Sequence, residues 1–246
     1  MTGQTGDSVL LTDSLAGADP RSTAIDYFGT AISYGELDKL STAVAHGLAA
    51  HGVAPGDRVG LLFQNDPQLI VSMFAAWRAG AVVVPLNPML RPREIATVLS
   101  DSGARALISL ESSAAIALAS GASLDLVVTT SELEFAGAAS GPFAASARAD
   151  VPGATPLAAL AGYGGAAPPS SPVPDALTVL AYTSGTTGPP KGAMLSHHHL
   201  ATAGRLWRET FGIGKDDVIL ALSPLFHVSG LVGHIAAAAG AGAHWC

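Results

Sequence analysis

The chain has 246 residues, 49% of them hydrophobic, which is enough to bury a core as one large domain or two smaller ones. Its net charge of −7, from 12 basic and 19 acidic residues, argues against a general electrostatic partnership with nucleic acid. The single cysteine, Cys246, excludes an internal disulfide. We read no secretory signal and no uninterrupted apolar run of about 18 residues, so we expect a cytoplasmic protein without a transmembrane segment.

The first half of the chain alternates helical and strand patterns. Ser33 and Glu36 have the spacing of a capping box, and apolar residues then recur at helical intervals as far as Gly52. The pattern continues as strand 56–65, helix 66–80, strand 81–88, a helix followed by a strand over 91–109, and strand 124–130. Because the strands are nearly continuous apolar runs, we expect an α/β fold with mainly parallel sheets flanked by helices on both faces.

A change in amino-acid composition then divides the chain into three segments. Residues 131–174 are rich in Ala, Gly, Ser and Pro and lose all periodicity, which indicates an exposed connection. The alternation resumes as strand 175–185, helix 197–213, strand 216–225 and helix 228–243. We therefore expect a first α/β subdomain at 1–130, a connection at 131–174, and a strand–helix segment of a second α/β subdomain at 175–246.

The loop after the strand at 175–185 is unusually rich in glycine and hydroxyl side chains. Glycines let backbone amides approach an anion, hydroxyls add donors, a helix N-terminus adds partial positive charge, and Lys191 supplies a full one. The candidate phosphate-binding residues are Thr183, Ser184, Gly185, Thr186, Thr187, Gly188 and Lys191. Two alternatives remain open here: an ordinary polar turn, because the same residues dominate turns, and an unrelated phosphate-binding domain.

Three consecutive histidines, His197 to His199, invite a metal interpretation. Consecutive helical residues point in different directions, and the i, i+4 spacing of helical zinc ligands is absent. We therefore expect a polar helix start and assign no metal ligands. The adjacent Asp216 and Asp217 indicate a solvated turn.

Three stretches carry a family resemblance. The segment "YTSGTTGPPKG", residues 182–192, resembles the phosphate-loop signature of the adenylate-forming superfamily, which includes acyl- and aryl-CoA ligases, luciferases and adenylation domains of peptide synthetases. "LSPLFHVSGL", residues 222–231, is similar to that family's next motif, and residues 32–95 are similar to its N-terminal region. The resemblance implies the N-terminal domain of an acyl-CoA synthetase-like fold, most like the fatty-acid-CoA ligases.

The resemblance implies roles for the residues that match. The seven loop residues named above would wrap the β- and γ-phosphates of MgATP, and His227 would lie between the nucleotide and acyl pockets, with Lys191 and His227 as the catalytic candidates. The alternative for His227 is a core histidine at a strand end. The implied reaction converts ATP and a small carboxylic acid, a fatty acid by that likeness, into an acyl-adenylate and pyrophosphate, and then transfers the acyl group to coenzyme A.

The sequence ends shortly after the His227 motif, before the family's magnesium-binding glutamate and its C-terminal lid with a catalytic lysine. We therefore expect this chain alone to be incomplete as a catalyst, with a separately encoded C-terminal half as a candidate partner. The alternative is a catalytically dead remnant that serves as a nucleotide-binding or interaction module.

Overall fold

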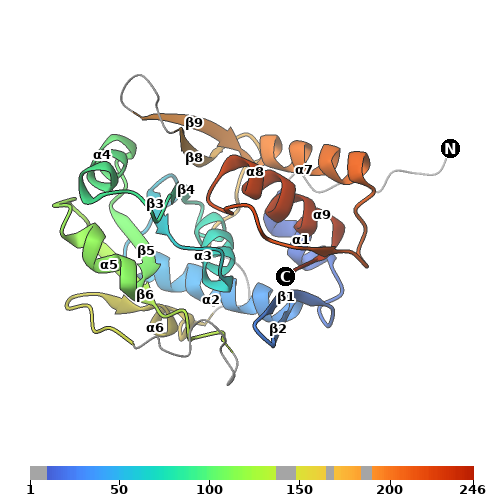
Figure 1. Cartoon of the computed structure of the whole chain (residues 1–246), viewed down its shortest axis with the longest axis horizontal. Coiled ribbons are helices and arrows are strands. Elements are labelled where there is room, and N and C mark those ends of the chain that lie inside the picture. Colours follow the sequence, from blue (N-terminus) through green and yellow to red (C-terminus); the bar gives the residue numbers. More distant parts are fainter. Residues whose placement is uncertain (1–9, 137–147, 165–168, 184–189) are drawn as a thin grey trace.

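Two β-sheets carry the fold of the computed structural model, which describes residues 10–136, 148–164, 169–183 and 190–246 (Figure 1). In the larger sheet all neighbouring strands are parallel except the last pair, β8 and β9. In spatial order its strands are β7 (Thr155–Pro156), β6 (Leu126–Thr130), β5 (Ala106–Leu110), β3 (Arg58–Leu62), β4 (Val82–Leu86), β8 (Leu177–Thr183) and β9 (Lys191–Ser196). The expected mainly parallel α/β architecture is confirmed.

Helices cover both faces of this sheet. One face packs on α2 (Tyr34–Ala50) and α3 (Pro67–Arg78), and the other on α4 (Pro92–Ser102) and α5 (Glu111–Leu118). The predicted capping box starts α2, because Ser33 accepts from the amide of Glu36 while the Glu36 side chain accepts from the amide of Ser33. Every residue of α3 is buried, which explains why its sequence is apolar all round.

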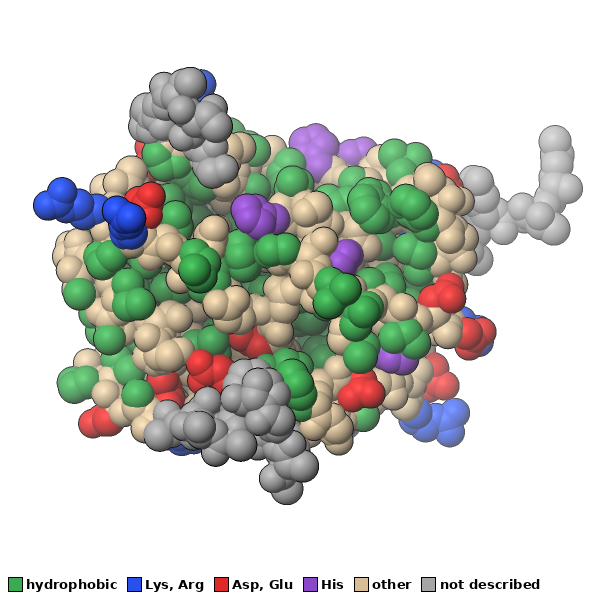
Figure 2. Space-filling model, viewed as in Figure 1, with side chains coloured by type: hydrophobic (Ala, Val, Ile, Leu, Met, Phe, Trp, Pro, Cys, Tyr) green, Lys and Arg blue, Asp and Glu red, His purple; other side chains and the backbone are tan. Residues whose placement is uncertain are grey.

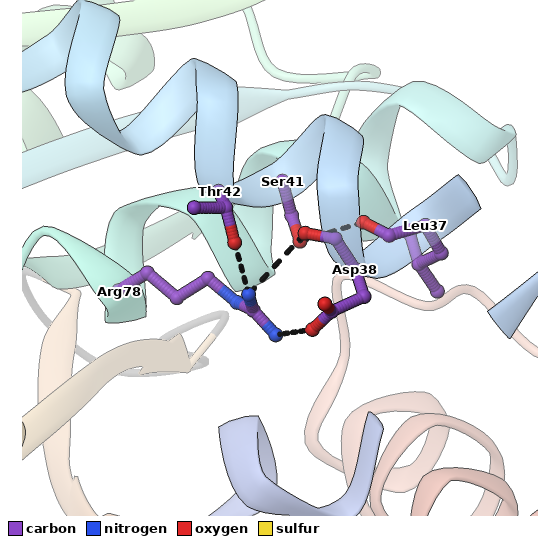
Figure 3. Close-up of polar contacts among 5 residues, drawn as sticks. All are labelled: Leu37, Asp38, Ser41, Thr42 and Arg78. Atoms are coloured by element: carbon purple, nitrogen blue, oxygen red, sulfur yellow. Dashed lines mark hydrogen bonds and ion pairs between the residues drawn. The ribbon is translucent and has the colours of Figure 1, made fainter. Parts of the chain in front are cut away.

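Gln68, Ser72 and Arg78 are the polar exceptions, and Arg78, at the end of α3, is the charged one. Its guanidinium reaches α2, where Nη2 lies 2.6 Å from Oδ1 of Asp38 and Nη1 donates to the Asp38 carbonyl and to Thr42 Oγ1 (Figure 3). Ser41 Oγ donates to the carbonyl of Leu37 beside this cluster. A buried guanidinium is tolerated only when it is paired and hydrogen-bonded, so this contact fixes how α2 and α3 dock.

The smaller sheet joins the two ends of the described chain. The early strand β1 pairs with the last strand β11, with Ile25 opposite Trp245. The strand order is β10 (Val218–Ile219), β11 (His244–Trp245), β1 (Thr23–Tyr27) and β2 (Thr30–Ser33). Around it lie α1 (Leu11–Gly17), α7 (His197–Phe211), α8 (Val228–Gly230), the π-helical η2 (Leu231–Ala236) and α9 (Ala237–Ala241).

Several short elements of this second region escape the sequence pattern. The strand expected at 216–225 is ordered as a strand only at β10, and β1, β2, β11 and α1 were not predicted. A strand of two residues shows no alternation, so only its pairing with a remote partner defines it.

The segment 131–174 is more structured than its composition suggests. It contains β7, which extends the large sheet beside β6, and α6 (Leu157–Ala161). Leu157 and Leu160 are buried, and Leu160 packs on α2 where Gly47 leaves room for it. The expectation of a wholly exposed connection is therefore wrong for this part, although the division into subdomains stays a prediction. Within the described ranges, no helix is both long and apolar enough to cross a membrane.

Candidate functional site

The predicted phosphate loop connects two strands rather than a strand and a helix. Strand β8 runs into the loop and β9 returns antiparallel to it, so α7 begins only after six further residues of strand. The expected contribution of a helix N-terminus to the loop is wrong for this reason. Ser184, Gly185, Thr186, Thr187 and Gly188 lie outside the described residues.

Thr183 and Lys191 face each other at the loop end of this hairpin. They are register partners, the Oγ1 of Thr183 is 3.5 Å from the carbonyl oxygen of Lys191, and both residues are exposed. The two ends of the loop are therefore held at a fixed separation by the strand ladder. An ammonium group and a hydroxyl are presented together beside the loop that joins them.

The hairpin is tied to α4 one residue pair before the loop. The phenol of Tyr182 donates to Oδ2 of Asp101 at 2.5 Å, and burial, reinforced by that carboxylate, raises the pKa of Tyr182. Opposite Tyr182 in the register stands Gly192, where a Cβ would lie 3.2 Å from the phenol ring. The ring therefore lies across the partner strand. Sequence reasoning quoted Tyr182 within its motif but assigned it no role.

The three consecutive histidines have three different environments. His197 is buried: its Nε2 shares a 2.9 Å hydrogen bond with Thr178 Oγ1, and its ring packs edge-on against Trp77. His198 is exposed, and His199 completes a capping box with Ser196 at the start of α7. The expected polar helix start is thus correct for His198 and His199 and wrong for His197, which belongs to the core.

His227 lies at the turn before α8 and is exposed, unlike a core histidine. Its amide donates to the carbonyl of Pro224 at 3.1 Å, and its carbonyl accepts from the amide of Leu231 at 2.8 Å. Gly230 closes this turn: a Cβ there would lie 2.3 Å from the Pro224 carbonyl oxygen, so any larger residue would force the backbone apart. The ring of His227 is therefore carried by a tightly constrained backbone.

One edge of the large sheet gathers these features. Strands β3, β4 and β8 are parallel, so their carboxyl ends lie at the same edge, with Thr183 at the end of β8 and Asn65 just beyond β3. The connections from β3 and β4 lead to α3 and α4 on opposite faces, which makes this edge the point where ligands bind in open α/β sheets. The side chain of Asn65 bonds the loop that leads to His227.

Beside Asn65 the edge is hollowed by an apolar cavity of about 370 Å³. Its walls include Leu220, Leu225 and Trp245, together with Asp66 at the N-cap of α3. Burial raises the pKa of Asp66 to about 8, although the amide of Leu69 bonds its Oδ1 and opposes the shift. The carboxyl group is therefore mostly protonated at neutral pH and adds little negative charge near an anion.

Comparison with known proteins agrees with this geometry. A family model described as AMP-binding enzyme matches residues 13–246. A feruloyl-CoA synthase of Amycolatopsis sp is 37% identical over 86% of this chain and 38% of its own length. A long-chain-fatty-acid–CoA ligase of Mycobacterium tuberculosis is 33% identical over 81% of this chain and 36% of its own length.

A solved structure is also similar. The ATP-bound RpMatB–BxBclM chimera superposes with a TM-score of 0.76 at 29% identity, over 96% of this chain and 44% of that one. The chain therefore spans less than half the length of each of these three proteins.

Proposed function

Because the chain belongs to the AMP-binding enzyme family, we propose that it supplies the ATP-phosphate side of an enzyme that activates a carboxylic acid as its acyl-adenylate and passes the acyl group to coenzyme A. The feruloyl-CoA synthase and the long-chain-fatty-acid–CoA ligase to which it is similar join acids to coenzyme A, and a similar solved structure holds ATP. The activity, the acid and any partner that completes the enzyme are all part of the proposal.

The observation that carries the proposal is the pairing of Thr183 with Lys191 at the loop end of the β8–β9 hairpin. A charge-assisted hydrogen bond from a lysine to a phosphate oxygen contributes about 1.5–3 kcal/mol. The hairpin holds that charge at the carboxyl edge of the sheet, where a nucleotide can also contact the loop leading to His227. An ordinary polar turn would not require a lysine at this edge of the sheet.

In the proposed reaction the protein acts mainly by positioning ATP and the carboxylic acid. The substrate carboxylate attacks the α-phosphorus of ATP, the α–β phosphoanhydride bond breaks, and pyrophosphate leaves with its electron pair. Lys191 and the loop residues 183–188 would hold the β- and γ-phosphates, spreading the negative charge that develops on the leaving group. His227 would border the acyl group. Coenzyme A thiol then displaces AMP from the adenylate to give the thioester.

The family also implies Mg²⁺. Within the described residues, no group of three or more His, Cys, Asp or Glu side chains is arranged to hold a metal ion. We therefore assign no Mg²⁺ ligand in this chain and derive no step through the ion.

Two classes of carboxylic acid are candidates for the substrate. Overall likeness of the sequence favours a fatty acid, whereas the feruloyl-CoA synthase favours an aromatic one. A panel of octanoate, palmitate, benzoate and ferulate in carboxylate-dependent exchange of labelled pyrophosphate into ATP separates these classes. The chain would be assayed alone and with a C-terminal half from a relative.

Phosphate binding is tested by Lys191→Ala. We expect the Kd for MgATP to rise at least tenfold, because about 1.5 kcal/mol or more is lost with the ammonium group. Lys215→Ala is the matched control, since Lys215 is an exposed lysine paired with its neighbour Asp216. Equal affinities for MgATP in the wild type and the Lys191→Ala variant would contradict the proposed site.

The second candidate function is a nucleotide-binding or interaction module without catalysis. It is supported by the same pairing of Thr183 with Lys191 beside the loop, which would bind a phosphate whether or not a reaction follows. Tight MgATP binding, without pyrophosphate exchange for any acid in either assay, would favour this module over the ligase.

A further inference from the structure

Asn65 connects two segments that are far apart in the sequence. Its side-chain amide donates to the carbonyls of Ala221 and Ser223, both at 2.8 Å, and its side-chain carbonyl accepts from the amide of Leu225 at 2.9 Å. The three bonds bridge 156 to 160 residues of chain. A partly buried side chain beyond β3 thus holds the loop 221–225, which follows β10.

Only a primary amide of this length makes all three bonds at once. It offers two N–H donors and an acceptor in one plane, whereas a carboxylate offers acceptors only and an alkyl group offers nothing. Removal of the Asn65 side chain would leave the carbonyls of Ala221 and Ser223 and the backbone N–H of Leu225 without this hydrogen-bond partner. Loss of a partner by a buried backbone group is costly, so the loop would rearrange to recover solvent contacts.

The held loop leads directly into His227. Leu225 is two residues before His227, and the amide of His227 bonds the carbonyl of Pro224. Gly230 packs so closely on Pro224 that the backbone of the turn leaves no free space between them. A displacement of Leu225 would therefore be passed to the imidazole and would not be absorbed between them.

We propose that Asn65 is a positioning residue that clamps the loop 221–225 and thereby sets the place of the His227 ring at the carboxyl edge of the large sheet. The clamp itself stands on the hydrogen bonds described above. Its bearing on acyl transfer rests on the proposed function. Asn65 is thus separate from the phosphate-holding hairpin but serves the same reaction.

Hydrogen exchange at the Leu225 amide tests the clamp in the 246-residue chain. In Asn65→Ala we expect exchange at this amide to accelerate about tenfold or more, because its acceptor is lost. Exchange at Ile108, in the central strand β5, should stay unchanged. Gln64→Ala is the matched control, since Gln64 is the exposed neighbour of Asn65. Unchanged protection of Leu225 in Asn65→Ala would overturn the proposal.

Asn65→Asp removes the two donated hydrogen bonds and keeps the accepted one. It also replaces the alanine variant in the test if that variant does not fold. The carboxylate still accepts from Leu225, so that amide should keep most of its protection. It cannot donate to Ala221 and Ser223, so the carbon-bound proton and carbon resonances of the His227 imidazole should shift as they do in Asn65→Ala. Imidazole resonances that match the wild type in both variants would show that Asn65 supports the fold without positioning His227.

Ligand affinity relates the clamp to the reaction. The probe is 5′-O-(N-benzoylsulfamoyl)adenosine, a stable mimic of an acyl-adenylate, compared with a non-hydrolysable ATP analogue. We expect Asn65→Ala to weaken binding of the acyl mimic several-fold and to leave the ATP analogue unaffected. Equal weakening of both ligands would overturn a specific role beside the acyl group. If Lys191→Ala leaves MgATP affinity unchanged, the proposed function fails, while the exchange result still decides whether Asn65 clamps the loop.

Discussion

The imidazole of His197 illustrates how burial controls a single residue. It lies between Trp77, with ring centroids 5.7 Å apart, and the hydroxyl of Thr178, and it is almost fully buried. Burial lowers the pKa of His197 to about 4, because the charged form would lose its hydration, and the nearby Asp13 only partly opposes this shift. His197 is therefore neutral in the folded protein throughout the ordinary pH range.

This environment predicts a pH dependence of stability. Between pH 6.5 and about 4 the unfolded chain binds a proton at His197 that the folded chain does not, so the free energy of unfolding falls as pH falls through this window. The contribution is on the order of 3 kcal/mol at the low end, at about 1.4 kcal/mol per pKa unit. Urea denaturation at a series of pH values measures it.

Two variants isolate the effect of His197. In His197→Gln, which keeps a hydrogen-bonding group but does not titrate, we expect the free energy of unfolding to vary less with pH between 4 and 6.5. His198→Gln, at the exposed neighbour, should vary as the wild type does. An unaltered pH profile in His197→Gln would show that the pKa of this imidazole is the same in the folded and the unfolded chain.

At the scale of elements, α7 and the helical segment after His227 interlock through glycines. Gly204 of α7 lies against Ala236, where a Cβ would come within 2.8 Å of the Ala236 carbonyl carbon. In the reverse direction Trp207 of α7 covers Gly233 of η2, where a Cβ would lie 2.7 Å from the indole ring. The two helices can approach this closely because each has a glycine at the contact.

We therefore expect Gly204→Ala to destabilise the protein by about 1–2 kcal/mol. Alanine favours the helix by about 1 kcal/mol, but the added methyl group would meet backbone atoms that must shift, so the overpacking cost falls in the upper part of its usual range, at about 2–3 kcal/mol. Gly17→Ala is the control, because a Cβ at this end of α1 would meet nothing within 4 Å. Thermal denaturation measures both variants, and equal stabilities would contradict the close packing.

At the scale of the whole molecule, large hydrophobic side chains are exposed on α7, on β10 and the loop after it, and on α8, and hydrophobic surface is visible at the right of Figure 2. The smaller sheet also ends there in the unpaired edge of β10. The exposed residues of these segments include Leu206, Phe211, Val218, Leu220, Leu222 and Val228. An apolar surface beside a free strand edge favours association with another protein surface.

This surface predicts concentration-dependent self-association of the isolated chain. We expect the double variant Val218→Asp and Leu222→Asp to sediment closer to a monomer than the wild type does, because the charges repel across the edge. Met89→Asp is the control, since Met89 is 80% exposed but lies in the loop before α4, away from this edge. A wild type that stays monomeric at every concentration would contradict the prediction.

Long elements were predictable because their signals are local. Ser33 and Glu36 determine the start of α2 within four residues, and the largely apolar sequence of α3 and the unbroken apolar run of β4 match their burial. The glycine- and hydroxyl-rich loop was likewise found from composition and from its family resemblance. Each of these signals lies within one stretch of chain.

Other features depend on partners that are remote in the sequence. The strand character of Lys191–Ser196 arises from pairing with β8, the burial of His197 from Trp77, and the role of Asn65 from a loop more than 150 residues away. The sequence by itself determined the α/β alternation, the family resemblance and the candidate phosphate residues. Only the tertiary structure decided the hairpin, the second sheet and the clamp on His227, because a hydrogen bond between distant segments leaves no periodic or compositional trace in either of them.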